Sequence, residues 1–288
     1  MASRPDGNDE QAAGHASPHL DEKERDQASA HATPRALVIH EIVREEGEAA
    51  LARKPSALLW SALAAGLSMG FSFLTQAVLQ SKVTPGESGV TLIGAAGYCV
   101  GFVIVVLGRQ QLFTESTLTV VLPVLTRRDL RTAAAALRLW LIVLVANLAG
   151  TWMFAGLLAA PTAYTEALAP MLEHIGRGAY GSNFVTTTLK ATLAGWLIAL
   201  MVWLLPNARS AALLIIAVLT YVVAICGLSH VIAGSVEAAY LVLRGLADAQ
   251  GYLLRFLAPT LLGNVIGGIA LVGLLNHASI SPEMRGQQ

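Results

Sequence analysis

Five ionisable residues interrupt segments of the chain that are otherwise strongly apolar. Arg109 and Glu115 lie in GRQQLFTESTLTVVLPVL, and Lys190 lies in VTTTLKATLAGW. His230 and Glu237 lie in ICGLSHVIAGSVE. A charged side chain in an apolar environment is costly, and it usually faces a water-filled cavity or a partner group. Histidine can also donate a hydrogen bond to an anion or exchange a proton near neutral pH. These residues are therefore the first candidates for lining a polar passage.

The composition shows that the segments around them are built for lipid. Of the 288 residues, 55% are hydrophobic and 13% are charged, whereas soluble proteins carry roughly 25% charged residues. Residues 1–34 hold almost no large apolar side chain, so we expect a disordered tail. A net charge of zero gives no indication of nucleic-acid binding. Cys99 and Cys226 lie in apolar runs without metal-ligand spacing, so no metal or cofactor is expected.

Apolar runs of about 20 residues, the length that crosses a membrane as a helix, recur after the tail. Four regions have this length, one of them despite containing Lys190, and two are too long for one span and too short for two. Each of these two contains a polar interruption. We therefore predict an all-α membrane protein with six transmembrane helices, two of them broken. The predicted spans cover residues 57–79, 90–125, 139–160, 184–205, 211–243 and 256–275.

The flanking segments predict the topology. Residues 35–55 place Leu37, Val38, Ile42 and Val43 at helical spacing before Pro55, as in an amphipathic helix on the membrane surface or against a neighbouring subunit. Lysine and arginine favour the cytoplasmic side, and the loops on the side of the termini hold nine of them against four opposite. We expect a channel domain over 56–277, a tail over 278–288, and both termini in the cytoplasm of a bacterial-type inner membrane.

The two interruptions occupy matching positions in two halves of the chain, about 56–160 and 183–277. Asn147 in ANLAG and Asn264 in GNVIG are 117 residues apart, and the same offset takes Phe113 to His230. Three spans per half give the halves opposite topology. Inverted halves with discontinuous helices are typical of a permeation site at the membrane midplane. Because non-helical backbone in a bilayer needs protein or water to satisfy it, we interpret the interruptions as pore-lining loops.

Four motifs resemble the formate/nitrite transporter family, in the right order, over residues 36–277. GRQQLFTES resembles the loop that breaks the family's second helix (xELFTS), and LKATLAGWLIALMVW resembles its fourth-helix signature (KGxLCNWLVCLAVW). GLSHVIAGSV resembles the fifth-helix loop (GFEHSVANM), and PTLLGNVIGG resembles the sixth-helix motif (PVTxGNIIGG). The resemblance implies an aquaporin-like bundle of six spans and a homopentamer with one pore per protomer. It also implies passage of small monovalent anions such as formate, nitrite, hydrosulfide or lactate.

The resemblance assigns pore residues at the positions that match. The family's fifth-helix histidine corresponds to His230, and its fourth-helix lysine corresponds to Lys190. An aromatic constriction would involve Phe71 or Phe73 of the first span. The Leu-Phe-Thr of the first loop corresponds to Leu112, Phe113 and Thr114.

Two family asparagines are replaced, by Gly195 in the fourth span and by Gly234 after the second interruption. These changes are expected to remove hydrogen-bonding groups near the pore and to leave room. Asn147 and Asn264, which have glycines nearby, are expected to serve close helix packing rather than chemistry.

The remaining charged residues have alternative interpretations. Arg109 and Glu115 are expected to pair with each other or to cap helix ends, and so to stabilise the first loop, rather than to contact substrate. Glu237, two turns after His230 on the same face of a helix, either lines the pore or meets a partner helix. Lys190 either attracts anions or extends to the nearer membrane interface.

The working hypothesis is an anion pathway in which Lys190 attracts the substrate and an apolar constriction favours its protonated form beside His230. The alternative is a channel of the same fold for a small neutral solute or a different anion. A membrane protein with a closed pore and a structural or sensory role also stays open. The chain contains no H-E-x-x-H or G-x-S-x-G motif, so no enzyme is expected.

Overall fold

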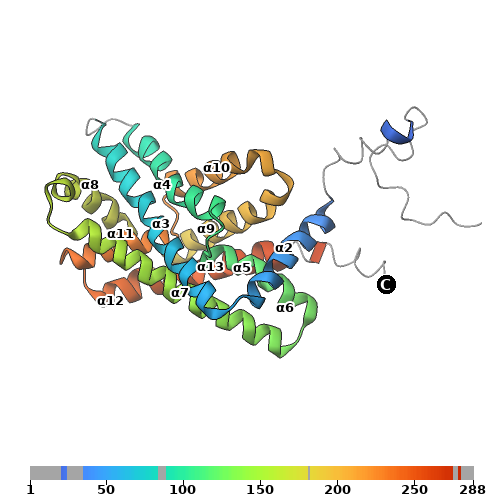
Figure 1. Cartoon of the computed structure of the whole chain (residues 1–288). Coiled ribbons are helices and arrows are strands. Elements are labelled where there is room, and N and C mark those ends of the chain that lie inside the picture. Colours follow the sequence, from blue (N-terminus) through green and yellow to red (C-terminus); the bar gives the residue numbers. More distant parts are fainter. Residues whose placement is uncertain (1–20, 25–34, 84–88, 181, 275–277, 280–288) are drawn as a thin grey trace, which may run out of the picture.

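The computed structural model describes residues 21–24, 35–83, 89–180, 182–274 and 278–279, and these form helices joined by turns, without a strand among them (Figure 1). Most of the expected tails, 1–34 and 278–288, lies outside the described residues. The α-helices are α2 (Ala36–Ala52), α3 (Pro55–Ser81), α4 (Gly89–Leu107), α5 (Phe113–Thr119), α6 (Val121–Arg127), α7 (Leu130–Ala159), α8 (Ala163–Ala179), α9 (Phe184–Leu204), α10 (Ala212–Ile225), α11 (Ala233–Leu243), α12 (Ala249–Gly251) and α13 (Ala258–Ile266). Two 3₁₀ turns, η2 (Leu205–Asn207) and η3 (Arg209–Ala211), and two π-helical segments, η4 (Tyr252–Leu257) and η5 (Gly267–Leu274), lie between them, and residues 22–24 and 278–279 are also helical.

Four helical segments are long and apolar enough to cross a membrane, and they match the four predicted regions that have the length of one span. The second of the four begins at Leu130, nine residues before the predicted start at residue 139. The last begins at Ala249 and consists of α12, η4, α13 and part of η5. Pro259 near the start of α13 has no backbone N–H to donate, and wide π-helical turns precede and follow this helix. The four segments are Pro55–Ser81, Leu130–Ala159, Phe184–Asn207 and Ala249–Ala270.

The helix is interrupted in both regions where the sequence predicts an interruption. In the first, the backbone leaves the helix after Leu107 and re-enters it at Phe113, and Arg109 takes a left-handed conformation with φ of 50°. In the second, α10 ends at Ile225 and Gly227 has φ of 57°, a conformation that glycine adopts without strain. We call residues 108–112 the first break and residues 226–232 the second break.

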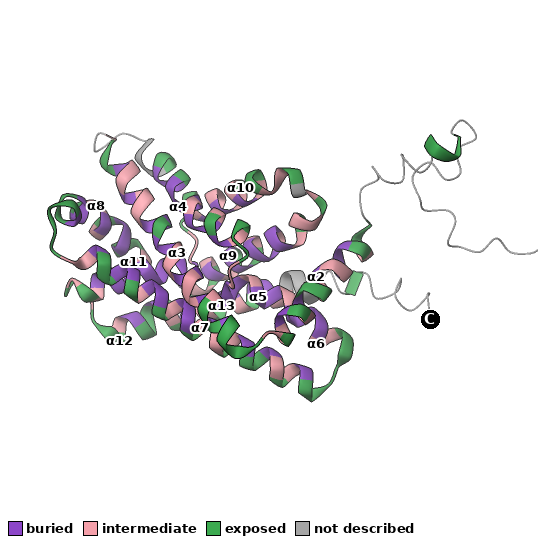
Figure 2. Cartoon of the chain, in the orientation of Figure 1, coloured by how far each residue is buried: buried purple, intermediate pink, exposed green. Residues whose placement is uncertain are grey.

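Figure 2 shows exposed residues along the long helices, and many of these residues are large and apolar. Large aliphatic side chains on several helices are more than half exposed in the single chain. A soluble monomer rarely exposes so much apolar surface, so these faces need an apolar environment such as lipid or another subunit. Examples are Val145, Leu157, Leu189 and Leu213.

The expected amphipathic helix before the first span is present as α2, and Pro55 starts the next helix. Its buried face is rotated from the predicted one, because Ile39 and His40 are buried while Val38 is 43% exposed. Gly47 lies against the carbonyl of Thr119 at the end of α5, where a Cβ atom would not fit. The helix therefore packs against the segment that follows the first break (Figure 1).

The amphipathic helix α8 was missed in the sequence analysis. Thr162 caps its first turn in a capping box with Thr165, and Leu168, Leu172 and Ile175 supply its buried face. Glu166 forms an ion pair with Arg244 at the end of α11, with 2.7 Å between Oε1 and Nη1. The capping residue and the i, i+4, i+7 spacing were both visible in the sequence.

The glycine positions correct one expectation. A Cβ atom on Gly195 would lie 2.4 Å from the Asn264 carbonyl oxygen, and one on Gly234 would lie 2.8 Å from Cε2 of Phe256. Neither glycine leaves room, because the neighbouring helix or ring occupies the space. Gly66 of α3 approaches the Asn147 carbonyl oxygen in the same way. At each of two helix crossings, α3 with α7 and α9 with α13, the close approach thus depends on a glycine that packs against the backbone of an asparagine.

Changing Gly195 to alanine is expected to destabilise the protein, because the added methyl group requires α9 and α13 to separate. Overpacking of this kind costs about 1–3 kcal/mol. The matched control is Gly156→Ala in α7, where nothing lies within 4 Å of the added Cβ atom. That change is expected to be neutral or to stabilise the helix by up to about 1 kcal/mol. Thermal unfolding of the two purified variants measures the difference, and equal midpoints would contradict the close crossing.

Candidate functional site

The two breaks meet at a buried hydrogen bond between Thr114 and His230. Thr114 is the second residue of α5, and His230 lies in the second break; their Oγ1 and Nε2 atoms are 2.8 Å apart. Each of the two residues is about 1% exposed. Phe102 of α4 presents its ring to the imidazole, with 5.0 Å between the centroids in an edge-to-face arrangement. Segments more than 100 residues apart thus converge on one polar pair in an apolar surrounding.

The hydrogen bonds assign the tautomer of His230. The backbone N–H of Ala233 donates to Nδ1 over 3.1 Å, so Nδ1 acts as an acceptor. In neutral imidazole one nitrogen accepts and the other carries the proton, which here is Nε2. Nε2–H therefore donates to the Thr114 hydroxyl, whose own hydrogen is available to a third group. A doubly protonated ring would lose the bond from Ala233, so this geometry favours the neutral form.

Asn147 of α7 holds the first break in place. Its Oδ1 accepts a hydrogen bond from the N–H of Phe113 at 2.9 Å. Its Nδ2 donates to the carbonyls of Gln111 and Ala62, at 3.0 and 2.7 Å. One side chain therefore satisfies the backbone on both sides of Leu112 and links the break to α3.

Asn264 of α13 holds the second break in place in the same way. Its Oδ1 accepts from the N–H of Val231 at 2.8 Å, and its Nδ2 donates to the carbonyls of Ser229 and Ala191, at 2.9 and 2.8 Å. Both asparagines are completely buried. Their amides thus serve the breaks directly, in addition to the close packing that the sequence suggested.

These bonds correct the predicted correspondence of Phe113 with His230. Val231 makes the bond to Asn264 that Phe113 makes to Asn147, so the matching offset at the breaks is 118 residues and not 117. His230 then corresponds to Leu112. The sequence contained one indication of the asparagines' role, because a buried amide in an apolar span has to find hydrogen-bond partners.

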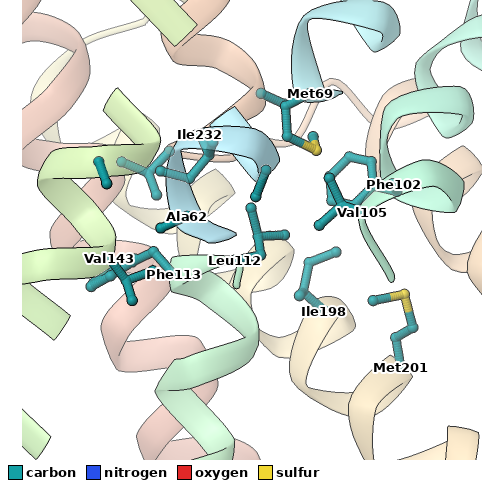
Figure 3. Packing of buried hydrophobic residues seen from close by; sticks show 14 of the residues in the cluster. Ala62, Met69, Phe102, Val105, Leu112, Phe113, Val143, Ile198, Met201 and Ile232 are labelled. Atoms are coloured by element: carbon teal, nitrogen blue, oxygen red, sulfur yellow. The ribbon is translucent and has the colours of Figure 1, made fainter. Parts of the chain in front are cut away.

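Leu112 and Phe113 are both buried, and their side chains lie in different surroundings. Figure 3 shows Phe113 beside Val143 of α7, whereas Leu112 lies toward Ile198. The Phe113 ring also packs edge-to-face against Trp140, with 6.2 Å between the centroids. The aromatic ring in contact with His230 is Phe102, which the sequence analysis did not single out.

The other predicted pore residues lie elsewhere in the fold. Lys190 is half-buried in the second turn of α9, next to Ala191, whose carbonyl binds Asn264. Phe73 is buried against Tyr240 of α11, at a centroid distance of 5.6 Å. Glu237 is partly buried on the same helix.

Phe71 has a different position from Phe73. It is 45% exposed on the outside of α3 and packs against Phe154 of α7, with 5.2 Å between the ring centroids. Among the described residues, no contact links Phe71 to Thr114 or His230.

A cavity of about 760 Å³ lies next to the first break. Residues of α2, the end of α4, the first break, α5, the end of α9 and η2 line it, with Ala212 at the start of α10. We call it the α2-side cavity. Its charged lining residues are Glu46, Arg53, Arg109 and Glu115.

Arg109 and Glu115 do not form the expected pair. Arg109 instead bonds to Glu46 of α2, with 3.0 Å between Nη2 and Oε1. Oε1 of Glu115 is buried and has no hydrogen-bond partner in the described part of the chain. The arginine thus fastens α2 to the first break, while the glutamate faces the cavity.

Nothing in the described residues forms a metal centre, since no group of three or more histidine, cysteine, aspartate or glutamate side chains is placed to hold an ion.

Comparison with known proteins gives concordant results. The family model described as formate/nitrite transporter matches residues 37–278. Inner membrane protein YfdC of Escherichia coli (strain K12) is 38% identical over 254 residues, which cover 88% of this chain and 82% of that protein. The uncharacterized transporter YrhG of Bacillus subtilis (strain 168) is 30% identical over 190 residues, 64% of this chain and 70% of that protein.

Two solved structures share the fold. A pentameric formate channel with formate bound superposes with a TM-score of 0.65 at 20% identity, over 77% of this chain and 95% of the other. An FNT family ion channel gives 0.66 at 19% identity, over 85% and 96%. The family and three of these four relatives are named as transporters or channels, not as enzymes. The chain is therefore an integral membrane protein that belongs to the formate/nitrite transporter family.

Proposed function

We propose that this protein passes small monovalent anions of the formate and nitrite class across a membrane, through a pore in each protomer of a homopentamer. The observation that carries the proposal is the buried Thr114–His230 pair, where the two breaks meet in a chain of this family. The solved pentameric formate channel with formate bound has the same fold, which supports the assembly and the anion. The exposed apolar faces of the long helices offer surface for subunit contacts and lipid.

The pore is formed by six spans in two inverted halves, about 56–160 and 183–277, in an aquaporin-like arrangement. The support is the matching set of three hydrogen bonds that each asparagine makes to its own break. The matching pair of glycine crossings, at Gly66 and Gly195, supports it further. Lysine and arginine are in excess in the loops on the side of the two termini, which favours a cytoplasmic position for both termini. The similarity to inner membrane protein YfdC favours a bacterial inner membrane.

The energetics favour passage of the substrate in a neutral form. Moving a bare anion through a dry constriction costs tens of kcal/mol in the Born limit. Protonating a carboxylate whose pKa is about 3.9, as for aspartate, costs only about 4 kcal/mol at pH 7. Neutralisation is therefore the cheaper route through the buried surroundings of Leu112, Phe102 and His230.

The residues have separate roles in this pathway. Lys190, half-buried in α9, attracts the anion toward the pore. His230 as the neutral Nε2–H tautomer fixes the Thr114 hydroxyl, whose hydrogen can bond an oxygen of the passing molecule. The pair thus replaces hydration in the middle of the pathway without carrying a charge of its own.

Uptake of labelled formate into proteoliposomes tests the proposal. Wild-type protein is expected to conduct formate, Lys190→Ala is expected to conduct it several-fold more slowly, and His230→Ala about tenfold more slowly. The charge-preserving Lys190→Arg variant should retain more flux than Lys190→Ala. Formate flux that is unchanged in both alanine variants would rule out the proposed pathway. Glycerol uptake in the same vesicles checks whether a neutral solute passes instead.

A further inference from the structure

The helix that follows the second break, α11, is held at its first turn by a chain of buried hydroxyl groups. This helix packs against α7 and α8 (Figure 1). The Oγ atom of Ser235 in α11 lies 3.0 Å from Oγ1 of Thr151 in α7 and 2.7 Å from the hydroxyl oxygen of Tyr252 in η4. Thr151 and Ser235 are completely buried, and Tyr252 is 4% exposed. Three segments that are distant in the chain are therefore joined through hydroxyl groups inside the fold.

The direction of these hydrogen bonds follows from the single hydrogen that each hydroxyl carries. The Thr151 hydroxyl donates to the Leu148 carbonyl of its own helix over 2.7 Å, so its oxygen accepts from Ser235. Ser235 has then used its own hydrogen, and its oxygen accepts from Tyr252. The chain thus runs from Tyr252 through Ser235 to Thr151 and ends on a carbonyl, and each hydroxyl hydrogen in it has an acceptor.

A second contact from η4 reaches the same turn of α11. Gly234 lies so close to the Phe256 ring that an added Cβ atom would be 2.8 Å from Cε2. The Phe256 ring also packs on that of Tyr252, with 5.8 Å between the centroids. Both rings belong to a π-helical segment, and π-helical turns within helices are frequent at functional sites. The segment η4 therefore holds the first turn of α11 by one hydrogen bond and one ring contact.

The turn that η4 holds is also the turn that orients His230. The backbone N–H of Ala233 donates to Nδ1 of His230, and the N–H of Gly234 donates to the His230 carbonyl over 2.9 Å. Ser235 follows directly, and its N–H donates to the Ile232 carbonyl over 3.2 Å. Because these groups belong to one helical turn, a rotation of that turn would move the Ala233 N–H away from Nδ1.

We propose that Ser235 and Tyr252 are positioning residues for His230. Their hydroxyl chain fixes the first turn of α11, so that the Ala233 N–H stays on Nδ1 and Nε2–H stays on Thr114. This inference rests on the function proposed above for the Thr114–His230 pair, and it adds the groups that keep the pair in register. A contact that only stabilised the fold would change unfolding and transport together, whereas a positioning contact can change transport alone.

The variant Ser235→Ala and the double variant Ser235→Ala with Tyr252→Phe separate these two roles. The single change leaves the Tyr252 hydroxyl buried without its acceptor, which should lower the thermal unfolding midpoint. The double variant has no unpaired hydroxyl left, because Thr151 still donates to Leu148, so its midpoint should return most of the way to that of the wild type. Full-length proteins are compared in lipid vesicles. We expect both variants to take up formate several-fold more slowly than the wild type, although only the single variant is clearly destabilised.

Nitrogen NMR of protein with isotope-labelled histidine, in lipid, follows the imidazole independently of transport. The His230 signals are those that are missing from His230→Ala. In the wild type they should report the neutral form with the proton on Nε2, and in the double variant a second form with the proton on Nδ1 should appear. The matched control is Tyr164→Phe in α8, because Tyr164 is 58% exposed and makes no hydrogen bond through its hydroxyl in the described part of the chain. It should leave midpoint, uptake and signals unchanged.

Two results would overturn this inference. One is a double variant that regains the wild-type rate of formate uptake together with its midpoint. The other is a double variant whose His230 signals match those of the wild type. If the wild type itself did not conduct formate, the proposed function would fail, and the NMR comparison would still decide whether the hydroxyl chain positions His230.

Discussion

Replacing Asn264 by alanine is expected to cause a large loss of stability and to abolish transport. The change removes the partner of the Val231 N–H and of the Ser229 and Ala191 carbonyls in one step. These groups lie inside the fold, where each unsatisfied backbone group costs about 1–3 kcal/mol. The loss should therefore reach about 3 kcal/mol or more, and the second break should no longer hold His230 in register with Thr114. Thermal unfolding and proteoliposome flux measure the two effects.

The same substitution at Asn147 provides an internal comparison, since this residue makes the corresponding three bonds to the first break. Asn147→Ala is expected to have an effect of similar size. Asn207→Ala is the matched control, because Asn207 lies exposed in η2, and it should leave both measurements unchanged. If Asn264→Ala unfolded and conducted like the wild type, the second break would have to be held by other contacts.

The sequence predicted the elements that are determined by residues close together in the chain. The breaks were found because polar residues interrupt runs of about 20 apolar residues, and α2 was found from its helical spacing before Pro55. The family was recognised from four short motifs in order, and the match over residues 37–278 confirms it.

What could not be predicted depends on partners that are distant in the chain. Arg109 binds Glu46, which lies 63 residues before it, and not the nearby Glu115. From the sequence, Gly195 is expected to leave room, yet the backbone of Asn264 occupies the space beside it.

The position of a break relative to its supporting helix also depends on tertiary contacts. An offset of 117 residues matched the two asparagines, but the breaks that they hold are related by 118. The second half has one residue fewer between its break and its asparagine, so the position that corresponds to His230 is Leu112 and not Phe113. Phe102 was overlooked for a similar reason, because nothing in α4 distinguishes a ring that contacts His230 from one that contacts lipid.

Thr114 and His230 are expected to act as one unit in transport, and a double-mutant cycle tests this. Thr114→Val removes the hydroxyl and keeps the shape of the side chain, which leaves Nε2–H of His230 without its acceptor. His230→Ala removes the other partner, together with the acceptor for the Ala233 N–H. Because either change breaks the same bond, each should slow formate flux by about tenfold, equivalent to about 1.4 kcal/mol.

The double variant should then conduct little worse than His230→Ala alone. Residues in direct contact show coupling energies of about 0.5–3 kcal/mol in such cycles, whereas independent sites give losses that add in free energy. Thr126→Val in α6 is the matched control, because its hydroxyl bonds only to the Leu122 carbonyl of its own helix. It should neither slow the flux nor couple to His230. Additive losses for Thr114 and His230, in variants whose unfolding midpoints match the wild type, would mean that the hydrogen bond between them has no role in passage. A strong coupling would instead show that the hydrogen bond between Thr114 and His230 takes part in passage, as expected if the imidazole orients the Thr114 hydroxyl toward the permeating molecule.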